Sequence, residues 1–300
     1  MTQFDMYNII DNKKNGKELT EAEIKWAIEN YMTDHVKEYQ MSALLMSIFL
    51  NGMTPAETAY LTDAMLYSGK TLKFEDKAVV DKHSTGGIGD KTSFILAPIA
   101  AACGVKVPMI AGRGLGFTGG TVDKVEAIPG FKTNLTLEEF EKDLLNEGLV
   151  LMGQTAEIAP ADGRIYALRD VTATIDSIPL ITASIMSKKL AEGANGIVMD
   201  IKVGSGAFMR TKGEAKKLAR SIINTSKRFD KNAVALLTNM NQPLGNAVGH
   251  TLEIIESIDV LKGKGPKDLT DLSLHLAAHM IVVAGVEKNF NTALRKAKAS

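Results

Sequence analysis

Side chains that could bind an anion and move a proton crowd around one glycine-rich turn, Gly-Gly-Ile-Gly at residues 86–89. Glycine lets successive backbone N–H groups converge, and a helix beginning near residue 92 would direct its positive end to the same point. The pattern predicts a phosphate site, with a plain surface turn as the alternative. It is not a P-loop, because Asp90 stands before Lys91 where that motif has glycine. The flanking residues that add charge or donors are Lys82, His83, Ser84, Thr85, Thr92 and Ser93.

His83 and the pair His275 and His279 need separate interpretations. Because histidine titrates near neutral pH, His83 beside an anion loop could donate a proton, although a lone histidine is more often structural. His275 and His279 lie one helical turn apart and could share a metal ion. The sequence offers no third ligand at a recognisable spacing, and the Leu-Ala-Ala between the two histidines favours packing in a core helix.

A second glycine-rich segment, residues 112–126, contains the spacing of a dinucleotide-binding loop at residues 114–119. Such a loop should open an amphipathic helix, yet Pro129 and Gly130 soon interrupt the chain. The glycines instead predict close approach of the backbone to a ligand or to the first loop. Farther along, Ser184 and Lys188 share a face if their segment is helical; the alternative is an amphipathic helix with a solvated lysine.

Residues 1–66 carry helical patterns and predict three or four packed helices. Thr20 with Glu23, and Thr54 with Glu57, have the spacing of capping boxes. From residue 78 short apolar runs alternate with helical segments, which predicts an α/β fold with a mostly parallel central sheet. Ligands bind such sheets at the carboxyl ends of the strands, where both glycine loops fall. The predicted strands are residues 78–81, 105–110, 150–152, 196–203 and 233–237, and the predicted helices include 95–103, 137–146 and 212–226.

The composition excludes several classes of partner. The 35 basic and 35 acidic residues cancel, so no net field attracts nucleic acid or an anionic membrane. The N-terminus lacks the basic start and apolar run of a signal peptide, and the longest apolar stretches are too short to span a bilayer. Cys103 has no second cysteine to pair with. We expect a cytoplasmic protein that binds neither nucleic acid nor membranes.

Five sequence blocks, in order, resemble the thymidine and pyrimidine-nucleoside phosphorylase family over nearly the whole chain. The resemblance implies an all-helical domain, residues 1–66 plus about 160–192, packed against a larger α/β domain, about 75–155 plus 195–300, with the active site between them. It also implies a homodimer joined through the helical domain. The blocks are residues 82–90, 112–126, 166–172, 177–189 and 203–209.

The same resemblance implies reversible phosphorolysis of a pyrimidine nucleoside, with inorganic phosphate as co-substrate and no cofactor. His83 would face the base carbonyl beside the glycosidic nitrogen. With Arg169 and Lys188 it would stabilise the negative charge that develops on the leaving base. The implied phosphate ligands are Lys82, Ser84, Ser93 and Thr121, to which the residue pattern adds Thr85, and the implied pyrimidine ligands are Arg169, Ser184 and Lys188.

Substrate choice depends on Met109, because broad-specificity members tend to carry lysine at this position. We therefore expect thymidine and deoxyuridine rather than uridine. One alternative is a broad pyrimidine-nucleoside phosphorylase. Others are a phosphoribosyltransferase of the anthranilate type, which would need acidic metal ligands, and a non-catalytic fragment that binds nucleoside or phosphate.

Three positions depart from the family pattern. Ala111 replaces a serine that binds phosphate, and Phe117 replaces a histidine of the second loop. Lys91 stands where broad-specificity members have a threonine near a monovalent cation, so its ammonium could substitute for that ion. No other metal is expected. The chain also ends at Ser300, whereas family members continue into a C-terminal region. The remaining ligands of the cation would be Gly89, Leu244, Ala247 and Glu256.

Overall fold

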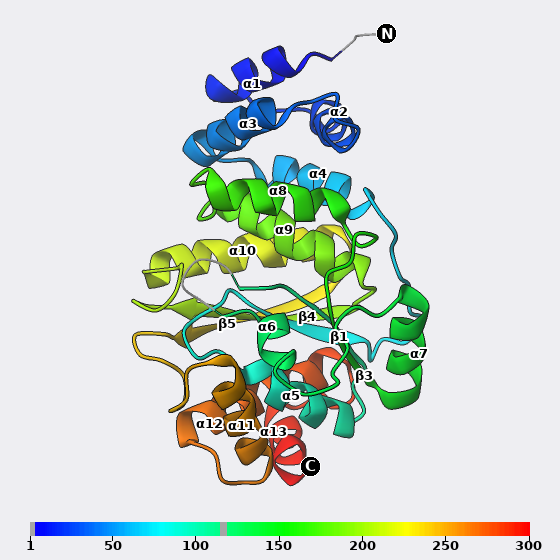
Figure 1. Ribbon diagram of the computed structural model, residues 1–300, viewed down its shortest axis with the longest axis vertical. Coiled ribbons are helices and arrows are strands. Elements are labelled where there is room, and N and C mark those ends of the chain that lie inside the picture. The colour runs from blue at the N-terminus through cyan, green and yellow to red at the C-terminus, as the bar shows by residue number, and fades with distance from the viewer. Residues whose placement is uncertain (1–3, 115–118) are drawn as a thin grey trace. The chain divides into compact units, whose positions relative to one another are not determined.

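The computed structural model describes residues 4–114 and 119–300, and its contacts divide the chain into two compact units (Figure 1). The helical unit comprises Met1–Leu72, Thr155–Ala191 and Arg220–Asp230. The α/β unit comprises Lys73–Gln154, Glu192–Ala219 and Lys231–Ser300. Each unit is therefore built from segments that are distant in sequence.

The helical unit packs its helices around a core of leucine, isoleucine, methionine and alanine side chains. The two predicted capping boxes, at Thr20 and Thr54, are both formed. Four helices precede residue 67, in agreement with the three or four predicted. The helices are α1 (Met6–Lys14), α2 (Glu21–Met32), α3 (Glu38–Asn51), α4 (Pro55–Leu66), α8 (Pro160–Val171), α9 (Ile178–Ala191) and the second half of α10 (Lys212–Arg228).

Glu57 joins three segments of the helical unit. Its Oε1 lies 2.7 Å from Lys13 Nζ and accepts a hydrogen bond of 2.8 Å from the Leu19 backbone N–H. Its Oε2 accepts from the Thr54 backbone N–H at 2.8 Å and so completes the capping box of α4. Burial would raise the pKa of Glu57, but the hydrogen bonds from Leu19 and Lys13 hold that pKa below its usual value.

The α/β unit contains parallel strands only, among the residues that the structure describes. Strands β1 (Val80–Ser84), β4 (Gly196–Val203) and β5 (Asn232–Asn239) form one sheet in the order β1-β4-β5. Strands β2 (Val107–Ala111) and β3 (Leu149–Gly153) form a second sheet. The predicted α/β class with parallel strands is confirmed. The predicted strand 78–81 was placed too early, because pairing with β4 extends β1 through Ser84.

Helices complete the α/β unit and enclose a core that includes the buried thiol of Cys103. His275 and His279 lie on α12, with ring centres 5.8 and 4.6 Å from the ring of Phe290. His279 is half-buried and packs as predicted, whereas His275 is exposed. The helices are the first half of α10, α5 (Thr92–Ala102), α6 (Thr121–Val125), α7 (Leu137–Glu147), α11 (His250–Leu261), α12 (Lys267–Val283) and α13 (Phe290–Ala299).

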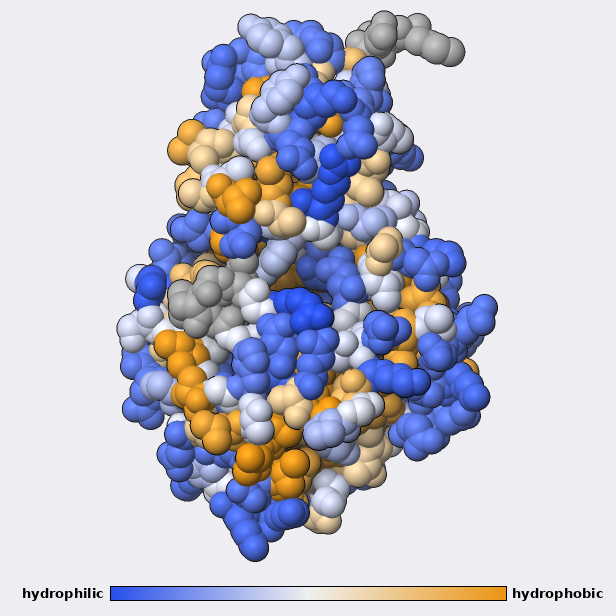
Figure 2. Space-filling view, viewed as in Figure 1, coloured by the Kyte–Doolittle hydropathy of each residue, from blue (hydrophilic) through white to orange (hydrophobic). Residues whose placement is uncertain are grey.

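The surface of the α/β unit has an apolar stripe along α11. Figure 2 shows apolar side chains gathered in the region of this helix, surrounded by polar ones. In the described part of the chain, no helix is both long and apolar enough to cross a bilayer. The stripe comprises Val248, Leu252, Ile255, Ile258 and Leu261, which are between 44% and 56% exposed.

Candidate active site

The first glycine-rich turn connects the end of β1 to the start of α5. Lys82, His83 and Ser84 are the last residues of the strand, and α5 begins at Thr92, close to where the sequence predicted a helix. Gly86 and Gly89 adopt φ angles of 83° and 74°, a region that side chains disfavour. Glycine is therefore used where the chain reverses from strand to helix.

The ammonium of Lys82 binds hydroxyl groups at the start of α5. Lys82 Nζ donates to Thr92 Oγ1 at 2.8 Å and to Ser93 Oγ at 3.5 Å. Burial of the side chain lowers the pKa of Lys82, and the charges of Asp90 and Asp200 oppose that effect. The structure thus brings Lys82 and Ser93 together and adds Thr92 as their common neighbour.

Asp90 is a partner of these groups to which the sequence assigned no role. Ser84 Oγ donates to Asp90 Oδ2 at 2.5 Å, and Thr92 Oγ1 donates to Asp90 Oδ1 at 2.9 Å. Burial would raise the pKa of Asp90, but Lys202 and Lys82 hold it well below its usual value. The carboxylate is therefore ionised and accepts hydrogen bonds from both hydroxyl groups.

Strand β4 supplies a buried ion pair close to the turn. Lys202 Nζ lies 2.6 Å from Asp200 Oδ2 and 3.9 Å from Asp90 Oδ1. Burial would lower the pKa of Lys202, but Asp200 and Asp90 raise it. Thr85 Oγ1 accepts a hydrogen bond of 2.9 Å from the Lys202 backbone N–H, so Thr85 ties the turn to β4. Among the described residues, the hydroxyl of Thr85 takes part in hydrogen bonding as an acceptor only.

The second glycine-rich segment contacts the first through Lys124. This lysine of α6 is 1% exposed, and its Nζ donates to the backbone oxygen of Asp90 at 2.7 Å. The same ammonium lies 2.7 Å from Glu253 Oε2 on α11. Thr121, an expected phosphate ligand, is the first residue of α6 and is half-buried. Lys124 is therefore a buried link that the spacing of the motifs did not reveal.

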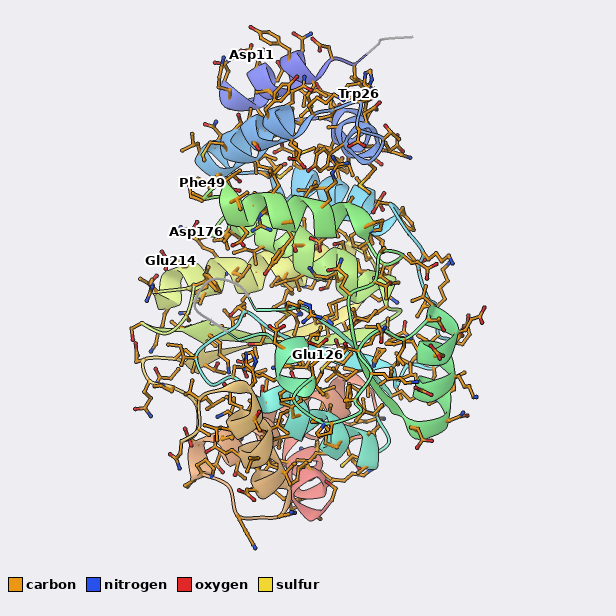
Figure 3. The ribbon with its side chains drawn as sticks, in the orientation of Figure 1. Asp11, Trp26, Phe49, Glu126, Asp176 and Glu214 are labelled. Carbon is orange, nitrogen blue, oxygen red and sulfur yellow. The ribbon has the colours of Figure 1, made fainter. Side chains whose placement is uncertain are left out.

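A cluster of ion pairs joins the beginning of the second glycine-rich segment to its end. Arg113 lies 2.9 Å from both Asp123 Oδ1 and Glu126 Oε1, the latter residue being labelled in Figure 3. Asp123 Oδ2 also accepts from the Gly114 backbone N–H at 2.6 Å. A Cβ at Gly120 would lie 2.2 Å from the Arg113 backbone carbon. Glycine is required there because the segment approaches its own beginning.

Met109 and Ala111 lie two residues apart on β2. Met109 is 2% exposed and belongs to the core of the α/β unit, so its side chain is enclosed by protein. Ala111 is half-buried at the end of the strand, where it pairs with Gly153. A methyl group can donate no hydrogen bond, so this position adds no phosphate ligand. Phe117 lies outside the described residues.

Lys91 occupies the position in which the sequence suggested a monovalent cation. Its Nζ donates to Leu244 O at 2.8 Å, to Ala247 O at 2.7 Å and to Glu256 Oε2 at 2.6 Å. The side chain of Lys91 is fully buried. A Cβ at Gly89 would lie 2.8 Å from Leu244 O, so the turn also approaches this loop closely. The ammonium therefore already satisfies three of the oxygens that an ion would bind.

A second cluster of expected site residues lies within the helical unit. Lys188 Nζ lies 2.6 Å from Asp162 Oδ2, donates to Ser184 Oγ at 3.2 Å and lies 5.1 Å from the centre of the Tyr166 ring. Burial raises the pKa of Tyr166 to about 12, so its phenol is neutral. Ser184 and Lys188 thus share a helix face and touch, whereas Asp162 and Tyr166 are partners that sequence reasoning did not propose.

Arg169 is held by the loop that connects α8 to α9 and by the first turn of α9. Its Nε, Nη1 and Nη2 donate to the backbone oxygens of Thr174, Leu180 and Ile175 at 3.2, 3.2 and 2.5 Å. Burial lowers the pKa of Arg169, and Asp162 opposes this effect. A guanidinium has five N–H groups, and contacts with the described residues use three of them.

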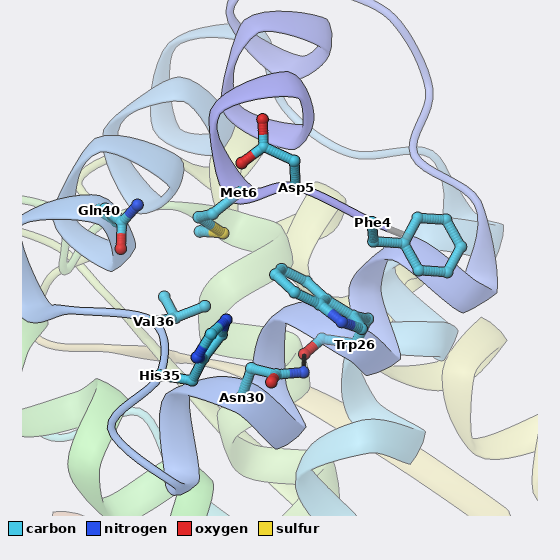
Figure 4. A pocket seen from close by; sticks show the side chains of 8 residues that line it. All are labelled: Phe4, Asp5, Met6, Trp26, Asn30, His35, Val36 and Gln40. Carbon is cyan, nitrogen blue, oxygen red and sulfur yellow. Dashed lines mark hydrogen bonds between the residues drawn. The ribbon is translucent and has the colours of Figure 1, made fainter. Parts of the chain in front are cut away.

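The helical unit also has a hollow lined by aromatic and polar side chains (Figure 4). Trp26 and His35 meet edge to face there, with ring centres 6.2 Å apart. Asn30 Nδ2 donates to the backbone oxygen of Trp26 at 2.8 Å. Phe4 and Met6 complete its apolar wall. None of the expected site residues lines this hollow, so it is separate from the cluster around Lys188.

Family models match both the helical bundle and the α/β part of the chain. Residues 7–69 match the helical bundle domain of the glycosyl transferase family, and residues 76–300 match its a/b domain. The chain belongs to this glycosyl transferase family. The family resemblance predicted from the sequence is confirmed.

Curated relatives have about half of their aligned residues in common with this chain. The chain is 49% identical over 282 residues to the pyrimidine-nucleoside phosphorylase of Geobacillus stearothermophilus, and 48% identical over 281 residues to that of Bacillus subtilis (strain 168). Each alignment covers 93% of this chain and 65% of the relative, so the chain spans about two thirds of the relatives' length.

Solved structures with a similar fold include that of a phosphoribosyltransferase. The anthranilate phosphoribosyltransferase of Thermus thermophilus matches with a TM-score of 0.77 and 17% sequence identity. The match covers 97% of this chain and 93% of that chain. At this identity the likeness concerns the fold alone.

Proposed function

We propose that this chain catalyses the phosphorolysis of pyrimidine nucleosides. A phosphate oxygen forms a bond to C1′ of the sugar while the bond from C1′ to the base nitrogen breaks. The electron pair leaves with the base, which then takes up a proton, and the sugar is released as its 1-phosphate. The observation that carries the proposal is the cluster in which the buried Lys82 donates to the hydroxyls of Thr92 and Ser93, while Asp90 links Thr92 to Ser84.

Phosphate is assigned to this cluster because its groups are cationic or donate hydrogen bonds. Buried Lys82 supplies charge, and the half-buried hydroxyls of Ser84 and Ser93 supply donors beside it. Thr121, half-buried at the start of α6, is proposed as a further donor. For Ser84 to donate a hydrogen bond to phosphate, its hydrogen bond to Asp90 must break.

The pyrimidine is assigned to Arg169, Ser184 and Lys188 of the helical unit. A pyrimidine offers carbonyl oxygens that accept hydrogen bonds, and these become more negative as the glycosidic bond breaks. Two cations and a hydroxyl are the matching donors. Removing a single preorganised donor that acts on developing charge lowers kcat by about 10²–10³-fold. His83 is proposed as the proton donor, for which its position on β1 beside Lys82 is the support.

The names of the relatives favour broad pyrimidine specificity over the thymidine preference that we expected from Met109. They refer to pyrimidine nucleosides without restriction to thymidine. The enclosed side chain of Met109 also gives the narrower preference no support. We therefore propose that uridine and thymidine are both substrates.

An assay of base release tests the proposal directly. Purified chain is incubated with uridine or thymidine, with and without phosphate, and free base is measured by chromatography. Phosphate-dependent release from both nucleosides is expected. Release from thymidine alone would restore the narrower specificity, and no release at high protein concentration would refute the catalytic proposal. Formation of nucleotide from base, phosphoribosyl pyrophosphate and Mg²⁺ would instead favour a phosphoribosyltransferase.

Single variants separate the two binding assignments. Lys82→Met should abolish phosphate binding by calorimetry, and Lys188→Met should lower kcat about 10²–10³-fold. Lys25→Met, an exposed lysine of α2, is the matched control and should change neither. Loss of phosphate binding in Lys188→Met but not in Lys82→Met would show that the assignments are reversed.

A further inference from the structure

Asp162 and Lys188 form a nearly water-free ion pair inside the helical unit. Asp162 lies near the start of α8, and Lys188 lies near the end of α9. Their charged atoms are 2.6 Å apart, and the side chains are 1% and 12% exposed. An isolated buried charge is strongly unfavourable, so each of these groups depends on the other.

Only one of the two carboxylate oxygens of Asp162 accepts a hydrogen bond from the described residues. Its Oδ2 accepts from Lys188 Nζ, whereas its buried Oδ1 accepts no hydrogen bond from the residues that the structure describes. A carboxylate kept only to stabilise the fold would be expected to satisfy both oxygens, because each unsatisfied buried acceptor costs stability. The arrangement is therefore better explained by what Asp162 does to Lys188.

Asp162 restricts the position of a flexible side chain. Lysine has four rotatable bonds, and an unrestrained ammonium would sample many positions. Here the ammonium is held by the carboxylate, donates to Ser184 Oγ at 3.2 Å and lies 5.1 Å from the Tyr166 ring centre. The lysine is thus fixed against the hydroxyl that shares its helix face.

The same carboxylate sets the charge of the cluster. Arg169 and Lys188 are two cations, and Asp162 is the buried anion beside them, so these three groups together carry a single positive charge. Asp176, the other carboxylate that acts on Arg169, is exposed, so solvent screens its charge. Phosphorolysis places one negative charge on the departing pyrimidine. A cluster with one net positive charge neutralises that anion, and it attracts the neutral base of the substrate much less.

We propose that Asp162 is a positioning residue that fixes Lys188 and leaves the pyrimidine cluster with one net positive charge, matched to a base leaving as an anion. This inference rests on the proposed phosphorolysis. It predicts that Asp162 acts on turnover through Lys188 and hardly affects the binding of the neutral nucleoside.

Steady-state kinetics of Asp162→Asn test the inference. Asparagine keeps the shape but removes the charge, so kcat should fall by about 10- to 100-fold with little change in KM. The loss should be smaller for 5-fluorouridine, whose base is a better leaving group, and Asp162→Glu should recover part of kcat. Asp170→Asn, on the exposed face of the same helix, is the matched control and should retain full activity.

A double-mutant cycle separates positioning from a general structural effect. In a Lys188→Met background, Asp162→Asn should cost no further activity, because the residue through which it acts is absent. An equal loss in both backgrounds, or an unchanged kcat in the single variant, would overturn the inference.

A crystal structure of Asp162→Asn gives a readout that does not depend on turnover. The Lys188 ammonium should leave its place between Ser184 and Tyr166, and an unmoved ammonium would contradict the positioning role. If the unmodified chain releases no base, the proposed function fails, and this structural test still decides whether Asp162 positions Lys188.

Discussion

Ser84 can give its single hydroxyl proton to one acceptor at a time. In this structure the acceptor is Asp90 Oδ2, at 2.5 Å. Under the proposed function, a phosphate at the same hydroxyl would compete with an internal carboxylate, which Lys202 and Lys82 keep ionised. This competition would weaken the binding of phosphate. The same hydrogen bond gives the Ser84 hydroxyl an acceptor when no phosphate is present.

His83→Ala tests the proton-donor role at the residue scale. If His83 protonates the leaving base, kcat should fall by about 10²–10⁴-fold, the range for a general acid. The affinity for phosphate should stay close to that of the unmodified chain, because other side chains supply the phosphate contacts. His275→Ala, which removes an exposed histidine, is the control. An unchanged kcat in His83→Ala would remove this residue from the mechanism.

Ala111→Ser tests whether the end of β2 faces the phosphate. A serine there would add one donor, and a hydrogen bond to a charged group contributes about 1.5–3 kcal/mol, or roughly tenfold or more in affinity. Calorimetric titration with phosphate measures the change. The same substitution at Ala22, on the exposed side of α2, should have no effect. Unaltered phosphate affinity in Ala111→Ser would show that the position is not a ligand here.

The sequence singled out the residues that the structure brings together around Lys82 better than it singled out their partners. Lys82, Ser84 and Ser93 stand out because they flank a glycine turn. Asp200 and Lys202 lie inside an apolar run, so they were passed over as part of a buried strand. Their spacing of two residues places both on one face of the strand, and that signal could have been used.

At the element scale, Lys91 joins α5 to the loop before α11. Its ammonium binds Leu244 O, Ala247 O and Glu256, and Glu256 Oε1 also accepts from the backbone N–H groups of Asn246 and Ala247. Burial would raise the pKa of Glu256, but Lys91 and these N–H groups hold it below its usual value. The start of α5 is thereby attached to a loop more than 150 positions away.

In a Lys91→Thr variant, the link between α5 and the loop before α11 should depend on a bound potassium ion. The unmodified chain is expected to have the same activity and thermal midpoint in potassium and in tetramethylammonium buffers. The variant leaves a buried carboxylate and two carbonyls uncompensated, which should destabilise it by about 3–5 kcal/mol. Potassium, which prefers oxygen ligands, should restore part of that loss, and tetramethylammonium should not.

Lys106→Thr is the control for this prediction, because Lys106 forms a partly exposed pair with Asp76 in the same unit. Removing this pair should lower the free energy of unfolding only slightly, and the stability of the variant should not depend on potassium. Potassium dependence of the unmodified chain, or a Lys91→Thr variant as stable as its parent, would show that the ammonium does not replace an ion.

The elements themselves were mostly predictable, and their boundaries less so. Strand β4 and the capping boxes of α2 and α4 match the predictions because each has a strong local signal. The beginning of β1 was misplaced, because its extent is set by pairing with β4 and not by its own residues. The hydrogen bonds of Arg169 to the loop after α8 also depend on tertiary packing, so no local pattern indicated them.

At the scale of the whole molecule, buried carboxylates link folding to pH in both units. Glu57 in the helical unit and Asp90 and Glu256 in the α/β unit all have pKa values below their ordinary values of 4.5 or 3.8. A carboxyl whose pKa is lower in the folded state stabilises the fold above its unfolded pKa. That stabilisation is lost as the pH falls through the folded pKa, because the unfolded chain then binds more protons.

His279 adds a second contribution of the same sign at higher pH. Burial and then the charge of His275 lower the pKa of His279 below 6.5, so its protonation also favours the unfolded chain. The free energy of unfolding should therefore decline slightly below pH 6.5 and steeply below about pH 4.5. Urea titrations between pH 3.5 and 8, a range of about five units around these pKa values, would measure both steps.

Variants assign each step to its residue. Glu57→Gln and Glu256→Gln should each lower stability at neutral pH and make the acid step shallower, because the variant no longer has a proton to take up on unfolding. His279→Gln should remove the step near pH 6.5 alone. Glu147→Gln, at the exposed end of α7, is the control and should leave the curve unchanged. If the acid step kept its slope in both glutamate variants, ion pairs within the two units would not be what stabilises the fold against acid.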